Sequence, residues 1–209
     1  LRGGSYSAGA LSQIRQTVND GDVEADLKNL VNLTRKSNQS TDEDVKAGLD
    51  NKIEEIKINI NDKIKKGNDI YQTLSEGSIS KIEKLGDLAD VAAFRITELN
   101  KKLDKGEISK ETHQAAVEGL SNKYADSRKK IKTIINNAVV KEQVQAFSQR
   151  TGKEGKVTSM TSEEISNIKE EGFDSKQASS QFGFIKQHSD GNFEIILNKD
   201  KPMEGTAAH

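Results

Sequence analysis

Apolar residues recur at helical spacing through the middle of the chain. From Thr41 onward they are separated by four, four, three, four and four positions, a spacing that places them on one face of an α-helix. This first stripe consists of Val45, Leu49, Ile53, Ile56, Ile60 and Ile64. Thr41 is a suitable N-cap, and Lys65 and Lys66 followed by Gly67 are typical of a helix C-terminus. The pattern therefore predicts a helix over residues 42–66.

Two further stripes follow and predict a helical hairpin. The second stripe consists of Ile79, Ile82, Leu85, Leu88, Ala92, Ile96, Leu99 and Leu103. The third consists of Val117, Leu120, Tyr124, Ile131, Ile135, Ala138, Val139, Val144 and Phe147. Between them, Gly106 can end one helix and Ser109 can cap the next, so we expect a turn at 104–109. Narrow stripes of this kind bury a seam and not a globular core, so we expect them to contact other helices or another chain.

The two ends of the chain carry different patterns. The segment 11–35 has weaker helical character and is interrupted at NDGD, which predicts a weakly ordered or short helical region over 1–40. After Arg150 a short helix capped by Thr161 or Ser162 is expected to end at Gly172. Two runs of period two, 182–187 and 192–197, then surround SDG and predict a β-hairpin.

These elements predict a mainly α fold in which long antiparallel helices precede a small C-terminal α/β segment with one β-hairpin. The expected organisation has three regions, which are 1–40, a coiled-coil-like helical region over 41–150, and the α/β segment over 151–209. The only proline is Pro202, so the preceding residues lack the strongest helix breaker. Both ends are interpreted as cuts through a longer polypeptide, because the chain begins at Leu1 and stops within the first turn of an expected helix.

Composition narrows the classes of function. Charged residues make up 31% of the chain, yet the net charge is -1, so the charges are expected on solvated helix faces and give no specific nucleic-acid signal. The chain has no apolar run long enough to predict a membrane span. It also has no cysteine, so a metal site would need histidine and carboxylate ligands.

The C-terminal sequence EIILNKDKPMEGTAAH is expected to form an edge strand, a loop with Pro202 and Gly205, and the first turn of a helix that stops at His209. It resembles the entry to the active-site helix of zincin metallopeptidases, whose signature is His-Glu-x-x-His. The resemblance implies that His209 is the first zinc ligand, with the general-base Glu and the second His further along the polypeptide. Zinc is then expected in the full-length protein only, and the 209-residue chain contains no complete catalytic site. The other interpretation of His209 is an affinity tag or an ordinary exposed helix residue.

Other candidate residues are interpreted as structural. His113 and His188 are expected on the solvated surface. The paired carboxylates Glu54-Glu55, Glu163-Glu164 and Glu170-Glu171 are expected on charged helix faces, where they lack the burial that acid-base catalysis needs. The opening LRGG is similar to the tail of ubiquitin-like proteins and to double-glycine processing sites, but a flexible segment or a cleavage scar is the favoured interpretation.

Two functions of different classes remain open. In the first, the chain is the ordered part of a large polypeptide whose helical region precedes a zincin-like peptidase domain. Such a layout resembles secreted effectors and the cargo proteins that bacteriophages package in virions. In the second, the helices form a purely structural interaction module of a large assembly, and the C-terminal hairpin is only a cap. In both, the partners are other protein chains that cover the helical seams.

Overall fold

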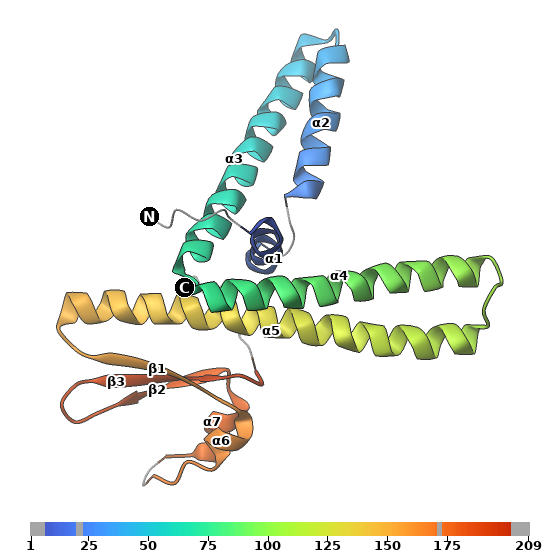
Figure 1. Cartoon of the computed structure of the whole chain (residues 1–209). Coiled ribbons are helices and arrows are strands. Elements are labelled where there is room, and N and C mark those ends of the chain that lie inside the picture. The colour runs from blue at the N-terminus through green and yellow to red at the C-terminus, as the bar shows by residue number, and fades with distance from the viewer. Residues whose placement is uncertain (1–6, 20–22, 171–172, 202–209) are drawn as a thin grey trace. The chain divides into compact units, whose positions relative to one another are not determined.

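A computed structural model describes residues 7–19, 23–170 and 173–201 (Figure 1). The fold is mainly α with a small three-stranded sheet near the C-terminus, so the predicted fold class is confirmed. The chain divides into two compact units, Leu1–Gln72 and Thr73–His209. Among the described helices, none is both long enough and apolar enough to cross a membrane.

The described residues of the first unit form three helices held together by side-chain contacts. Their bounds are α1 Ala8–Val18, α2 Glu24–Gln39 and α3 Glu43–Thr73. The Lys66 ammonium donates to the Val18 carbonyl at 3.2 Å, and Asn19 donates to the Lys63 carbonyl at 3.4 Å. The Lys63 ammonium also pairs with Asp26 at 2.6 Å. These contacts join α3 to the end of α1 and the start of α2.

The prediction that the first long helix ends before Gly67 is wrong, because α3 continues to Thr73. Gly67 is buried inside the helix, where the side chain of Arg15 crosses it. A Cβ atom at position 67 would lie 2.5 Å from Cγ of Arg15. The glycine thus permits close approach of the α1 side chain, and this tertiary contact outweighs the local stop signal.

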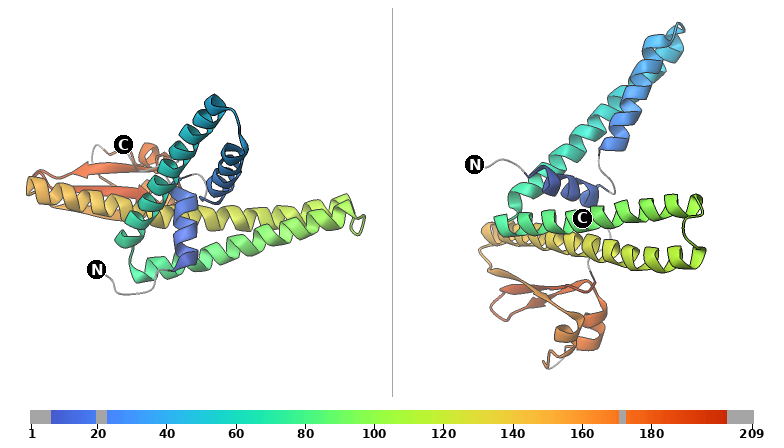
Figure 2. Two further views of the ribbon diagram at one scale, coloured as in Figure 1. Left: turned by 90° about the horizontal axis from the view of Figure 1, so that it is seen from above. Right: turned by 45° about the vertical axis from the view of Figure 1, so that its right-hand side comes forward.

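The second unit begins with a long helical hairpin of α4 Glu76–Asp104 and α5 Lys110–Thr151, which lie side by side in all views (Figures 1 and 2). The predicted turn is confirmed. Gly106 has a positive φ of 72°, and the Ser109 hydroxyl accepts from the Thr112 amide at 3.2 Å as the N-cap of α5. Past the turn, a 2.7 Å hydrogen bond joins the imidazole of His113 to Asn100 and fixes the register of the two helices.

The seam of α4 is built from smaller residues than the sequence pattern predicted. Its buried residues include Ile82, Gly86, Ala89 and Ala92, whereas Leu88 is 61% exposed. The spacing from Leu85 and Ala92 predicts Leu88 in the seam, but Ala89 occupies that place. Successive residues are about 100° apart around a helix, so both cannot face α5. Small side chains let two helices approach closely. Leu88 consequently lies on another face of α4.

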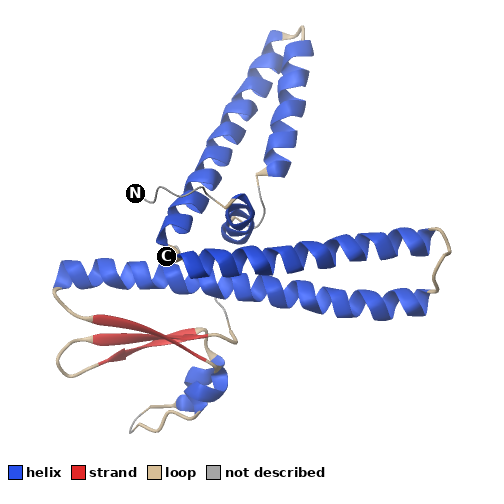
Figure 3. Ribbon diagram, viewed as in Figure 1, coloured by secondary structure: helices blue, strands red, loops and turns tan. Residues whose placement is uncertain are grey.

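The C-terminal part of this unit is a mixed sheet with two short helices (Figure 3). Its elements are β1 Gly155–Met160, α6 Ser162–Ser166, α7 Ser175–Ser180, β2 Gly183–Gln187 and β3 Phe193–Asn198. The strand order is β1-β3-β2, with β3 parallel to β1 and antiparallel to β2. The predicted hairpin is confirmed, while β1 and α7 were not predicted.

The predicted helix ending at Gly172 is shorter than expected. α6 ends at Ser166 with Asn167 as its C-cap, and Gly172 lies outside the described residues. The predicted start of this helix is confirmed, because Thr161 is the N-cap of α6 and forms a capping box with Glu164. A buried cluster of Ile165, Ala178 and Ile196 joins α6 and α7 to β3. This contact anchors both short helices to the sheet.

Candidate functional site: an apolar groove between α5 and the sheet

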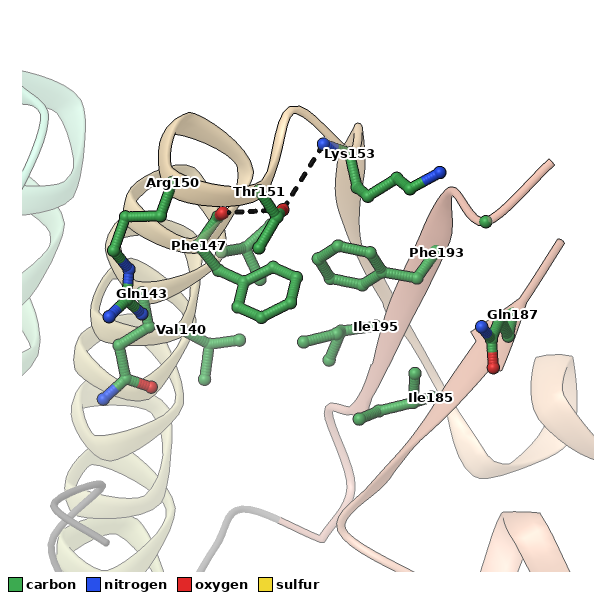
Figure 4. A pocket seen from close by; sticks show the side chains of 12 residues that line it. Val140, Gln143, Phe147, Arg150, Thr151, Lys153, Ile185, Gln187, Phe193 and Ile195 are labelled. Atoms are coloured by element: carbon green, nitrogen blue, oxygen red, sulfur yellow. Dashed lines mark hydrogen bonds between the residues drawn. The ribbon is translucent and has the colours of Figure 1, made fainter.

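The two faces of the sheet have different surroundings. Side chains alternate between the faces along a strand, so Ile196 of β3 faces α6 and α7, while Phe193 and Ile195 point to the other side. The register places Ile185 of β2 beside Ile195 on that other side. This second face is turned toward the end of α5, and the groove lies between them (Figure 4).

The groove has a volume of about 780 Å³ and is lined mainly by apolar side chains. Its walls come from the last turns of α5, the loop after it, and the β2–β3 hairpin. The lining residues are Val140, Gln143, Val144, Phe147, Arg150, Thr151, Lys153, Ile185, Gln187, Gly191, Phe193 and Ile195. Pockets of this size and character bind apolar ligands or apolar side chains of a partner.

The end of α5 is held in place by the turn that leads into β1. Gly152 adopts the left-handed conformation with φ of 67°, and its amide donates to the Ser148 carbonyl at 2.9 Å. The Ser148 hydroxyl accepts from the Gly155 amide at 3.1 Å. The Thr151 hydroxyl donates to the Phe147 carbonyl at 2.9 Å and accepts from the Lys153 amide at 3.3 Å (Figure 4). These bonds fix the direction in which the chain leaves the helix.

An aromatic pair joins the two walls of the groove. The rings of Phe147 and Phe193 meet edge to face, with centroids 5.4 Å apart and planes at 87° (Figure 4). Gly155 of β1 lies under this pair, and a Cβ atom there would come within 2.6 Å of Cγ1 of Val144 and even closer to the Phe193 ring. Glycine at position 155 therefore allows α5 to pack against the sheet at this point.

The lining of the groove combines exposed apolar side chains with two basic residues. Ile185 is 69% exposed and Phe147 is 43% exposed, so apolar surface is open to solvent on both walls. Arg150 extends beside Gln143 and Lys153 extends toward the hairpin (Figure 4), and none of the described lining residues is a carboxylate. The Lys153 ammonium donates to the Asp190 carbonyl at 3.2 Å, which holds its side chain at the hairpin. The groove is thus suited to an apolar segment.

On the opposite face, Asn198 holds the two short helices to the sheet. It is 3% exposed. Its amide nitrogen lies 3.0 Å from each of three acceptors, the Ser162 hydroxyl and the carbonyls of Ser179 and Gln181. Its carbonyl accepts from the Asp200 amide at 3.0 Å. A single side chain thereby connects the end of β3, the start of α6 and the end of α7.

The predicted site residue His209 lies outside the described residues, as do Pro202, Gly205 and the opening LRGG. Within the described ranges, no group of three or more histidine and acidic side chains lies close enough together to hold a metal ion. The strand that precedes Pro202 lies within the described ranges as β3, but the expectation of an edge strand is wrong, because β3 pairs with β1 on one side and with β2 on the other.

The residues expected on the surface have structural partners there. His188 is exposed at the hairpin. His113 is half-buried and forms a hydrogen bond with Asn100. Among the carboxylate pairs, Glu54 pairs with Lys57 at 2.6 Å and Glu170 contacts Lys186. Glu164 accepts from the Thr161 amide at 2.6 Å, and this bond is the first cause that lowers its pKa below the ordinary 4.5. These interactions agree with a structural role.

The groove itself was not foreseen from the sequence. The sequence pattern places Val144 and Phe147 in a helical stripe and the residues of β2 and β3 in a hairpin, and strand β1, which the pattern does not predict, connects the two. Comparison with protein family models, with curated proteins and with solved structures gives no match.

Proposed function

We propose that the chain is the helical region and the first part of the sheet domain of a larger, zincin-like metallopeptidase polypeptide. The observation that supports this proposal is the partly exposed apolar face of the sheet that forms one wall of the groove. β3 is the central strand, and its other face is already covered by α6 and α7. A helix that follows β3 would pack along the partly exposed face by a short connection, and the helix predicted from Gly205 onward would be that helix.

The properties of the groove agree with such an occupant. Thr206, Ala207 and Ala208 are small and would allow a helix to lie close to the sheet. In the proposal, His209 is the first ligand of a zinc ion that would activate water for peptide hydrolysis. The described residues would then act as a scaffold, in which α5 and the sheet orient the active-site helix.

The encoded sequence after His209 is the first test. The proposal requires Glu directly after His209 and a second His three positions after that Glu. Given that sequence, the full-length polypeptide should bind one zinc ion per chain and cleave peptides. Changing that Glu to Gln should abolish turnover while zinc stays bound, because the residue is a base and not a ligand. A full-length polypeptide that is free of zinc, or activity that survives the Glu change, would rule the peptidase out.

The second candidate is a purely structural interaction module, in which the groove receives an apolar helix from another protein chain. The exposure of Ile185 favours it, because an apolar face open to this extent is typical of an interaction surface. Ile185→Glu should weaken capture of such a partner, while Ile58→Glu on α3, at a residue that is 61% exposed, should not. If the polypeptide lacks the zinc motif and both variants bind the partner equally well, this candidate fails too.

A further inference from the structure

Helix α4 carries apolar side chains on two opposite faces. One face is buried and contains Ile82, Ala89 and Ala92. On the other face, Leu88, Val91 and Phe94 are 61%, 50% and 65% exposed. Leu88 and Phe94 lie three residues before and after Val91, which places them about 60° to either side of it around the helix. We name these three residues the α4 outer stripe. Its apolar surface is not explained by the α4–α5 hairpin.

Four of the charges near the α4 outer stripe are arranged symmetrically about Val91, whereas the position symmetric to Asp90, position 92, is alanine. Asp87 lies four residues before Val91, and Arg95 lies four residues after it. Lys84 and Glu98 lie seven residues before and after it. All four lie within about 40° of Val91 around the helix. Each of these four charges therefore has an opposite charge at the same distance on the other side of the centre.

We infer that the α4 outer stripe is a self-association surface, on which α4 of a second copy packs in the antiparallel direction around Val91. Antiparallel alignment reverses the order of charges, so Asp87 of each copy comes level with Arg95 of the other, and Lys84 comes level with Glu98. Packing of the i±4 rows, the commonest class of helix contact, brings Asp87 and Arg95 of the two copies together. A parallel pair would place like charges side by side.

The same symmetry defines the kind of interface. A two-fold axis near Val91 gives an isologous contact, in which one patch pairs with itself and closes at two copies. Three side chains of this size expose on the order of 300 Å² of apolar surface per copy. A standard stable interface buries about 800 Å² per partner. The dimer is accordingly of the weak, reversible class, and its formation depends on salt because the charges lie at the rim.

Sedimentation equilibrium of the 209-residue chain, at concentrations up to about 0.5 mM so that a weak interface of this class is populated, tests the inference. The wild-type chain should show a reversible monomer–dimer equilibrium. Phe94→Ser should reduce association at least tenfold, because it removes the most exposed apolar side chain. The matched control is Phe182→Ser, at a residue that is 52% exposed before β2, and it should leave association unchanged. Far-UV circular dichroism verifies that every variant remains helical.

Charge reversal tests the antiparallel order directly. Asp87→Arg alone and Arg95→Asp alone each create two repulsive contacts per dimer, and each should weaken association by about tenfold. The double variant Asp87→Arg/Arg95→Asp recreates both attractive pairs and should recover the wild-type equilibrium. A wild-type chain that stays monomeric at every concentration tested overturns the inference. Evidence that a different protein, or another segment of the same chain, occupies the α4 outer stripe also overturns it. A double variant no better than the single variants overturns the antiparallel arrangement.

Discussion

Replacement of Asn198 by alanine should loosen α6 and α7 from the sheet. Asn198→Ala removes the donor that the carbonyls of Ser179 and Gln181 share and the acceptor for the Asp200 amide. The site is 3% exposed, so these groups would lose their partner in a place with little access to water. An unsatisfied buried polar group costs about 1–3 kcal/mol. With two carbonyls affected and partial relaxation, we expect a loss of about 2–4 kcal/mol in the free energy of unfolding.

Asn198→Asp separates hydrogen bonding from packing. Aspartate has the same shape as asparagine and leaves no cavity, but it turns an acceptor oxygen toward two carbonyl oxygens, so it should destabilise the domain at least as much as alanine does. Because the chain has no Trp, the suitable assay is native-state hydrogen exchange of the β3 amides. Asn122→Ala, on the exposed surface of α5, is the control. If the β3 amides were equally protected from hydrogen exchange in Asn198→Ala and Asn122→Ala, the role assigned to Asn198 would be wrong.

Three further substitutions test the turn after α5 and the cap of α6. Gly155→Ala should cost about 1–3 kcal/mol by overpacking, and adding Val144→Ala should recover part of it in denaturant unfolding. Gly152→Ala should cost about 1–2 kcal/mol because its φ of 67° is unfavourable for alanine, which a lower thermal midpoint would reveal. Thr161→Ala should raise the pKa of Glu164 toward 4.5 in a carboxyl titration by NMR, because it removes one of the two hydrogen bonds that lower it.

The pH dependence of the capping box follows from the same lowered pKa. A carboxyl group whose pKa is lower in the folded state adds stability above its unfolded pKa and loses that contribution as the pH falls through its folded pKa. The contribution of Glu164 should therefore be complete at neutral pH and absent in strong acid. In Thr161→Ala the loss should begin at a higher pH. Equal titration of Glu164 in both proteins would contradict the capping geometry.

The long helices could be predicted because periodic spacing is a local signal. The turn at Gly106 and the cap at Ser109 were predictable for the same reason. The end of α3 was not, since the contact between Gly67 and Arg15 joins residues far apart in the sequence. Strand β1 pairs in parallel with β3 across the intervening helices, and nothing within GKVTSM indicates a partner that distant. The groove forms only where β1 joins the sheet to the end of α5, so local sequence patterns could not predict it.

Position around the helix, and not hydrophobicity alone, decides the role of an apolar residue in this chain. Leu88 and Ala89 are neighbours in α4, yet the smaller residue is 1% exposed and the larger is 61% exposed. A stripe chosen by size places Leu88 in the seam, whereas a seam that needs close approach selects alanine. The surplus leucine then remains on the outside with Val91 and Phe94. Exposed apolar side chains carry an aggregation risk unless neighbouring residues restrict which partners can pack against them. The opposite charges at Asp87 and Arg95 supply such control, because they favour one partner orientation over the others.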